Sequence, residues 1–185
     1  LVPCWAVSTK QEYGAHTLRP KLHRYLPVYF EEFPEAVPHQ IPWRGEPDEF
    51  SVEGTMDWLK PDRAVEEVSW IRSGETSAEA ALESFAAMRL SGYALNRNEP
   101  TAGGQSDLSP FLHFGQLSAQ RVALRIVGCR CFKPSANAVL EELLVRRELS
   151  DNYCLYNDNY DSFQGFPQWA RKTLGDHRGD KREYV

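Results

Sequence analysis

Residues that shape the backbone and bind anions are concentrated between Ser106 and Ser118. Ser109 and Pro110 are typical of a helix start, with Ser at the N-cap and Pro at the first helical position. The first amides of a helix have no intrahelical partner, so these amides and the nearby serine hydroxyls suit a phosphate. Gly115 is typical of a helix end, and Ser118 predicts the next N-cap. The segment therefore predicts a tight helical corner that faces an anion.

A second group of chemically active side chains lies between Glu141 and Glu148, where five of eight residues are charged. Glu142 and Arg146 are four residues apart with the acid first, which is a favoured helical ion pair. Such a run is typical of a solvated helix face held by ion pairs. The same arrangement also suits a carboxylate that an arginine holds toward the carbonyls and imides of bases. The residues alone leave both interpretations open.

Other familiar kinds of site are not indicated. The five histidines lack metal-site spacing, and the four cysteines contain no Cys-x-x-Cys pair, which favours free thiols in a reducing compartment. Gly103-Gly104-Gln105-Ser106 lacks the lysine of a P-loop, and Ser109 lacks the Gly-x-Ser-x-Gly context of a nucleophile. We therefore predict no metal site, no nucleotide hydrolase and no nucleophilic serine.

Bulk composition narrows the class of protein. The 185 residues are 42% hydrophobic and 12% aromatic, as expected of a globular chain. The net charge of −5 argues against a generally basic nucleic-acid coat and leaves room for a local basic groove. No apolar run approaches the roughly 18 residues of a membrane span, and no signal peptide is visible. We expect no membrane partner.

The first third of the chain predicts two short elements and a linker. The apolar residues of 1–8 predict a buried strand of a parallel sheet. Residues 11–33 have helical periodicity, interrupted at Arg19-Pro20 and Leu26-Pro27. The prolines of 34–61 exclude regular helix or central strand, and we expect a long linker anchored locally by Trp43, Phe50 and Trp58. Because the chain opens with Leu1 in a strand-like run, we also expect a segment of a longer protein.

The remainder predicts helices only. Thr76 to Glu79 matches a capping box, and a buried stripe follows in the next four turns at Leu82, Phe85, Ala86 and Leu90. We expect further helices over 118–127 and from Ser135 to about Tyr156, with a loop over 97–107. The predicted fold is mainly α, in which an α/β tail is followed by an α-helical domain.

Longer motifs then match a known family. The stretch 106–118 resembles the flavin-cradling segment of the photolyase and cryptochrome superfamily. The stretches 141–154, 160–163 and 166–172 narrow the resemblance to class II cyclobutane pyrimidine dimer photolyases, and 2–8 with 17–23 is similar to the end of their antenna domain. The resemblance covers essentially the whole chain.

This resemblance implies a domain organisation, a cofactor and a reaction. Residues 1–33 would end a Rossmann-like α/β antenna domain, 34–75 would be a proline-rich interdomain linker, and 76–185 would begin a helical FAD-binding domain. The implied enzyme is a lyase, deoxyribodipyrimidine photo-lyase, in which light-excited reduced FAD donates an electron to a pyrimidine dimer, the cyclobutane ring splits, and the electron returns. A second antenna chromophore is also implied, of unspecified identity.

The resemblance also assigns roles to the cofactor pocket. Tyr93 would lie at the phosphate end of the flavin. Ser106, Asp107, Leu108 and Ser109 would form the loop and cap that hold the diphosphate, in agreement with the anion-binding corner inferred from the residues.

Three further residues would face the lesion. Glu142 resembles the carboxylate that hydrogen-bonds the dimer and stabilises its radical anion. Arg97 would bridge the flavin pocket and the lesion, and Arg146, one turn after Glu142, would face the lesion side. The basic groove for damaged DNA would draw on the following residues: Arg97, Arg146, Arg147, Arg171, Lys172 and Arg178.

The resemblance also carries expectations about setting and completeness. We expect a monomer inside the cell, in the nucleus or a plastid of a eukaryote or in the cytoplasm of a bacterium. Helices that complete the flavin pocket in the superfamily would follow Val185, so we expect this segment to be inactive alone. Two alternatives stay open: a cryptochrome-like flavin photoreceptor without repair activity, and a helical binding module without a cofactor, which leaves 106–118 unexplained.

Overall fold

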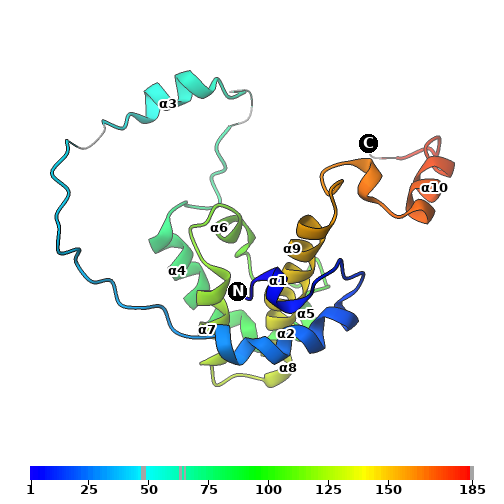
Figure 1. Cartoon of the computed structure of the whole chain (residues 1–185), viewed down its shortest axis with the longest axis horizontal. Coiled ribbons are helices and arrows are strands. Elements are labelled where there is room, and N and C mark those ends of the chain that lie inside the picture. The colour runs from blue at the N-terminus through cyan, green and yellow to red at the C-terminus, as the bar shows by residue number, and fades with distance from the viewer. Residues whose placement is uncertain (47–48, 63, 65, 184–185) are drawn as a thin grey trace.

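The computed structural model describes residues 1–46, 49–62, 64 and 66–183, and all regular structure among them is helical (Figure 1). The prediction of a mainly α chain is therefore confirmed. No helix in the described part of the chain is long and apolar enough to cross a bilayer. The helical elements follow one another in this order: α1 (Cys4–Val7), α2 (Ala15–Tyr29), α3 (Val52–Leu59), α4 (Glu75–Ser84), η1 (Phe85–Arg89), η2 (Leu90–Gly92), α5 (Tyr93–Asn96), α6 (Ser109–His113), α7 (Ala119–Val127), α8 (Lys133–Leu140), η3 (Glu141–Arg146), α9 (Arg147–Tyr156), η4 (Phe163–Gly165) and α10 (Gln168–Asp176).

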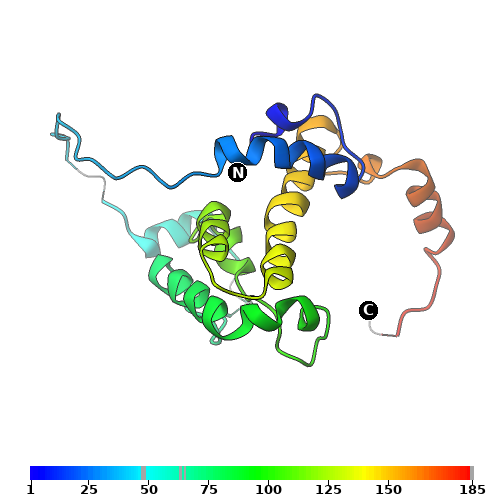
Figure 2. The ribbon, with the colours of Figure 1, turned by 90° about the horizontal axis from the view of Figure 1, so that it is seen from below.

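The long helix predicted from Ser135 to about Tyr156 is present as α8, η3 and α9, which follow one another without a break. We call this continuous stretch the central rod. It runs through the middle of the molecule, with α2 lying across it (Figure 2). Its middle segment, η3, is a π-helix, in which backbone bonds join residues five apart and the turn is wider than in an α-helix.

One hydrophobic core lies on the α8 side of the rod. Phe85, Leu90, Val122 and Ile126 are fully buried there, and Val139 of the rod joins them. The predicted apolar stripes of α4–η1 and α7 supply most of these contacts. The N-cap predicted at Ser118 is confirmed, because its hydroxyl accepts a hydrogen bond from the Arg121 amide at 3.1 Å. The buried faces of both helices therefore follow the apolar spacing of the sequence, and the start of α7 also has its predicted cap.

A second core joins the N-terminal segment to the rod. Leu18 and Leu22 of α2 are buried against Leu144 and Val145 of η3, with Val2 beside them. The π-helical segment thus lies between the two cores and contributes to both. Residues 1–30 are held to the helical body through a shared apolar interior.

A buried polar network strengthens this contact. The Glu12 amide donates to Asn152 Oδ1 at 2.7 Å, and the Ser8 hydroxyl donates to Glu12 Oε1 at 2.7 Å. Lys21 donates to the same carboxylate oxygen, and the Tyr156 hydroxyl donates to the Ser8 carbonyl at 2.6 Å. The Lys21 ammonium, with the Ser8 hydroxyl, lowers the pKa of Glu12 to about 2. The charged Glu12 carboxylate therefore accepts hydrogen bonds from donors inside the fold, which offset the cost of its burial.

The strand expected over residues 1–8 is wrong, because Cys4–Val7 is a helical turn and the described residues contain no strand for it to pair with. Pro3 has no amide to offer a sheet, and its carbonyl instead accepts from the Ala6 amide at 2.9 Å. The interruptions expected in α2 are also wrong, since the helix continues through Pro20 and Pro27. Its buried apolar face offsets the lost backbone bonds.

The expected absence of helix within 34–61 is wrong, and so is the expected local anchoring. Residues 31–46 form no regular helix or strand, but α3 is a helix, and Trp43, Phe50 and Trp58 are exposed rather than anchored. In Figure 1 the linker and α3 stand away from the helical body. The stretch 48–60 is free of proline, and the Ser51 hydroxyl accepts from the Gly54 amide to cap it. A local cap and a proline-free window are sufficient for two turns.

The capping box predicted at Thr76 is wrong. Gly74 takes the N-cap position with a φ of 107°, a conformation that favours glycine, and no side chain caps the helix. Its amide instead donates to Gln116 Oε1 at 2.9 Å. A distant glutamine, and not a local hydroxyl, therefore holds the start of α4.

We expect Glu12→Gln to destabilise the chain at pH 7 by about 1–2 kcal/mol, because it removes a buried charge from its hydrogen bonds. Since the folded pKa of Glu12 is lowered, its contribution is present above its ordinary pKa of 4.5 and is lost as the pH falls toward 2. Urea unfolding at pH 7 and at pH 3 measures both effects. Glu79→Gln, at an exposed position on α4, is the control, and equal effects of the two variants at pH 7 would contradict this account.

Candidate functional site

A cavity of about 270 Å³ lies where the 105–109 loop, α5 and the central rod meet. It brings together five residues that the sequence assigns to one site: Tyr93, Ser106, Leu108, Ser109 and Glu142. Its remaining walls are Gln105, Leu112, Val122, Val139, Leu143 and Arg147. Residues 49 positions apart in the sequence, Tyr93 and Glu142, thus line the same small space.

The helical corner predicted at 106–118 is present, with a shift of one residue at its start. Leu108 takes the N-cap position, Ser109 is the first residue of α6 and Pro110 the second. The Ser109 and Phe111 amides have no hydrogen-bond partner among the described residues. Gly115 ends the corner with a φ of 68°, as predicted. Free amides and a serine hydroxyl therefore do meet at this helix start.

Arg89 holds the loop before the corner from outside the cavity. Its guanidinium donates to the Asp107 carboxylate and, at 3.3 Å, to the Ser106 carbonyl. Asp107 has a φ of 59°, in the left-handed region, and the Ser106 hydroxyl accepts from the Leu108 amide at 3.4 Å. Asp107 therefore stabilises the loop through Arg89 and is not among the residues that line the cavity.

An ion pair between Arg97 and Glu142 joins α5 to the rod. The Arg97 Nη1 lies 2.8 Å from Glu142 Oε1, and both side chains are partly exposed. Gln105 donates to the Arg97 carbonyl and holds that end of the helix. Glu142 Oε2 has no hydrogen-bond partner among the described residues and is available to a ligand. The ion pair brings these two residues together, and Glu142 lines the cavity whereas Arg97 is not among the lining residues.

The ion pair predicted between Glu142 and Arg146 is wrong. Arg146 Nε lies 4.0 Å from Glu141 Oε1 instead, because the wider π turn places residues five apart, not four, above one another. Arg146 does not line the cavity, whereas Arg147 does. Arg147 was predicted only as part of a DNA groove, and no local pattern signals the π turn that brings it here.

Tyr93 supplies an aromatic ring to the cavity wall. It is buried, and its ring packs edge-on against Phe85 with centroids 5.6 Å apart. The remaining polar lining groups are the Ser106 and Ser109 hydroxyls, the Gln105 amide, the Glu142 carboxylate and the Arg147 guanidinium. Hydroxyls, free amides and a guanidinium are donors that fit a phosphate. The cavity is the size of a group within a cofactor and not of a dinucleotide.

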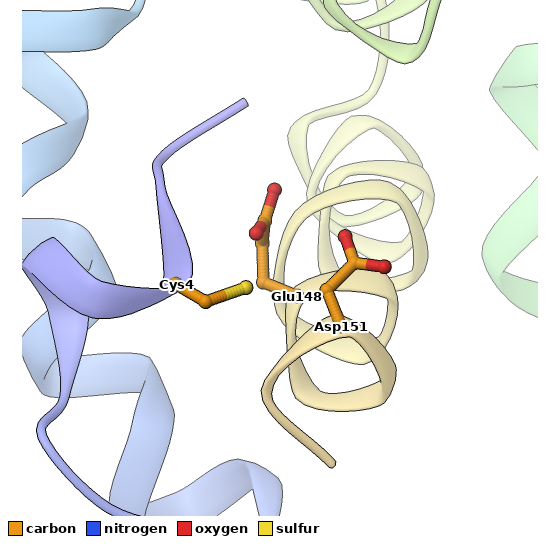
Figure 3. Close-up of side chains that lie close together, drawn as sticks. All are labelled: Cys4, Glu148 and Asp151. Atoms are coloured by element: carbon orange, nitrogen blue, oxygen red, sulfur yellow. The ribbon is translucent and has the colours of Figure 1, made fainter. Parts of the chain in front are cut away.

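Another cluster of reactive side chains lies where α1 packs against α9 (Figure 3). Ligand-type atoms of Cys4, Glu148 and Asp151 lie within 4.8 Å of one another. Burial, and then the two carboxylates, raise the pKa of the Cys4 thiol. Glu148 is buried, whereas Asp151 is more exposed. Because acidic groups commonly lie close together without a bound ion, we assign no metal to this cluster.

The chain is similar in sequence to several curated proteins that share one name. No family model matches the chain. It is 43% identical over 186 residues to the deoxyribodipyrimidine photo-lyase of Potorous tridactylus, and 44% and 43% identical over 198 residues to those of Oryza sativa subsp. japonica and Arabidopsis thaliana. Each match covers all of this chain but only 35%, 38% and 39% of the respective relative. The chain therefore spans less than two fifths of the length of these proteins.

We expect Asp107→Ala to destabilise the chain by about 1–2 kcal/mol, because alanine is strained at a positive φ and the Arg89 contact is lost. Asp107→Asn should cost less than about 1 kcal/mol, since asparagine tolerates this conformation and only an exposed ion pair is removed. Urea unfolding of the two variants measures the difference. Equal losses would contradict a role for the left-handed backbone at this position.

Proposed function

We propose that this chain, homologous over all 185 residues to part of the deoxyribodipyrimidine photo-lyases, serves light-driven repair of pyrimidine dimers in DNA. The motifs favour cyclobutane dimers and the class II group. The observation that carries the proposal is the Arg97–Glu142 ion pair at a cavity whose other wall is a phosphate-binding corner. Residues assigned to the cofactor and residues assigned to the lesion thus lie next to the same cavity.

Reduced FAD, when bound, would supply the photoexcited electron that opens the cyclobutane ring and would regain it after the ring has split. The donors of the corner at Ser106, Leu108 and Ser109 would hold its diphosphate, together with Arg147, and Tyr93 would lie at the phosphate end of the flavin. The identity of the cofactor as FAD rests on the family resemblance and the donor set. A second antenna chromophore, a monomeric state and an intracellular location are proposed on the resemblance alone.

Glu142 and Arg97 would recognise the lesion as a pair. A dimer is poorly stacked and is easily turned out of the duplex toward such a pocket. Glu142 Oε2 would accept an N–H of the dimer imide, and guanidinium N–H groups of Arg97 would donate to carbonyl oxygens on which negative charge develops. Such donors accelerate ring opening because their attraction grows with that charge. Arg146, which lies on Glu141, is better suited to a phosphate of the strand.

We expect Glu142→Gln, in a full-length photo-lyase that carries these 185 residues, to slow dimer splitting at least about tenfold. Flavin should remain bound, because the Glu142 carboxylate is not among the donors assigned to the diphosphate. The measurement is repair of a dimer-containing oligonucleotide under blue light, together with flavin absorbance. Unchanged repair would contradict the role of Glu142. A wild-type protein that binds flavin and repairs nothing would favour a cryptochrome-like receptor.

Arg147→Gln and Ser109→Ala should weaken flavin binding, unlike Glu142→Gln, since both remove hydrogen-bond donors from the anion corner. We expect the purified variants to retain less flavin per protein chain, with a loss of affinity of about tenfold for the charged donor. Flavin absorbance after purification and titration with added FAD measure the loss. Arg146→Gln is the matched control, because this arginine does not line the cavity, and equal flavin loss in that variant would contradict the assignment.

A further inference from the structure

Two neighbouring carboxylates on the rod bind arginines from different parts of the chain. Arg19 of α2 donates to Glu141 with two nitrogens, Nε to Oε2 at 3.0 Å and Nη2 to Oε1 at 2.6 Å. Glu142, the next residue, binds Arg97 of the helical body at 2.8 Å. The fork-to-fork geometry of the first pair fixes direction as well as distance. One arginine therefore holds the rod from the N-terminal side and another from the cavity side.

The backbone that carries Arg19 is itself firmly held. Leu18 and Leu22, on the same helix, are fully buried against the rod. Arg19 and Glu141 are 42% and 25% exposed at their side chains, so the pair is partly shielded from water. This contact joins residues 122 positions apart. It is the kind of tertiary contact that can decide the register of a helix.

The register of the rod decides which side chains face the cavity. In the π turn, Leu144 and Val145 pack against α2 while Glu142 and Leu143 line the cavity, as does Arg147 at the start of α9. An α-helical path through the same residues has about 3.6 residues per turn, so it would rotate one end of the rod relative to the other. The π geometry is rare and less favourable in isolation, and an outside contact at its first residue stabilises it.

We propose that Arg19 is a positioning residue for the lesion site: by binding Glu141, it holds the π turn that directs Glu142 and Arg147 into the cavity. This inference rests on the proposed repair function. Arg19 would thus affect the rate of dimer splitting from α2 without contacting the cofactor or the substrate. Arg146, 4.0 Å from the same carboxylate, is too distant to replace the two-nitrogen contact.

A double-mutant cycle tests this role in a full-length photo-lyase that carries these residues. We expect Arg19→Gln alone to slow splitting of a dimer-containing oligonucleotide about tenfold, as misplacement of a reacting group does. With FAD added to saturation, so that an effect through Arg147 on flavin retention is removed, the same change should have almost no further effect on the Glu142→Gln background, because Arg19 acts on splitting through Glu142. Arg19→Lys should restore little, since an ammonium cannot bind both carboxylate oxygens in one plane.

Arg125→Gln is the matched control. Arg125 also binds a glutamate, Glu83, with two nitrogens, each at 2.6 Å, but lies away from the cavity. We expect this variant to lose stability without slowing splitting. If Arg19→Gln slows splitting by its full factor on the Glu142→Gln background, or no more than Arg125→Gln, the positioning role is overturned while repair stands. A wild-type protein that repairs no dimers overturns the proposed function together with the inference that rests on it.

Discussion

The π turn at Glu141–Arg146 is the constraint on which the rest of the structure depends. It lies between two hydrophobic cores and contributes side chains to both. The side chains of two adjacent residues in this turn bind different partners: Glu141 binds Arg19, and Glu142 binds Arg97. A regular α-helix would align residues four apart and pair Glu142 with Arg146. The wider turn separates the carboxylate that holds the fold from the one that is available to a ligand.

Around this turn, contacts outside the cavity hold the groups that line it. Arg89 fixes the loop before α6 and leaves the Ser109 hydroxyl and the first amides of that helix free. Gln116 holds the start of α4, whose continuation leads to Tyr93. On the other side of the rod, the buried network of Glu12 and Asn152 ties the N-terminal segment in place. The polar groups of the cavity are thus left available because neighbouring contacts satisfy the backbone around them.

Local patterns in the sequence were sufficient for those elements whose cause is local. The cap at Ser118, the stop at Gly115 and the buried face of α7 depend on neighbours within one or two turns, and all are present. The grouping of Tyr93, Ser109 and Glu142 was predicted through a family resemblance, because no periodicity connects residues so far apart. The expected strand at 1–8 failed because a short apolar run does not specify a partner strand.

The exchange of Arg146 for Arg147 at the cavity has a different origin. Which of the two arginines faces the cavity depends on the one extra residue in the π turn. That turn is held by Arg19, which lies more than a hundred positions earlier in the sequence.

An experimental structure of a full-length photo-lyase carrying this sequence, bound to dimer-containing DNA, tests this arrangement most directly. We expect Glu142 at about 3 Å from a dimer imide nitrogen, with Glu141 still bound to Arg19. A regular α-helix over 141–146, with Glu142 paired to Arg146 and turned from the dimer, would contradict it.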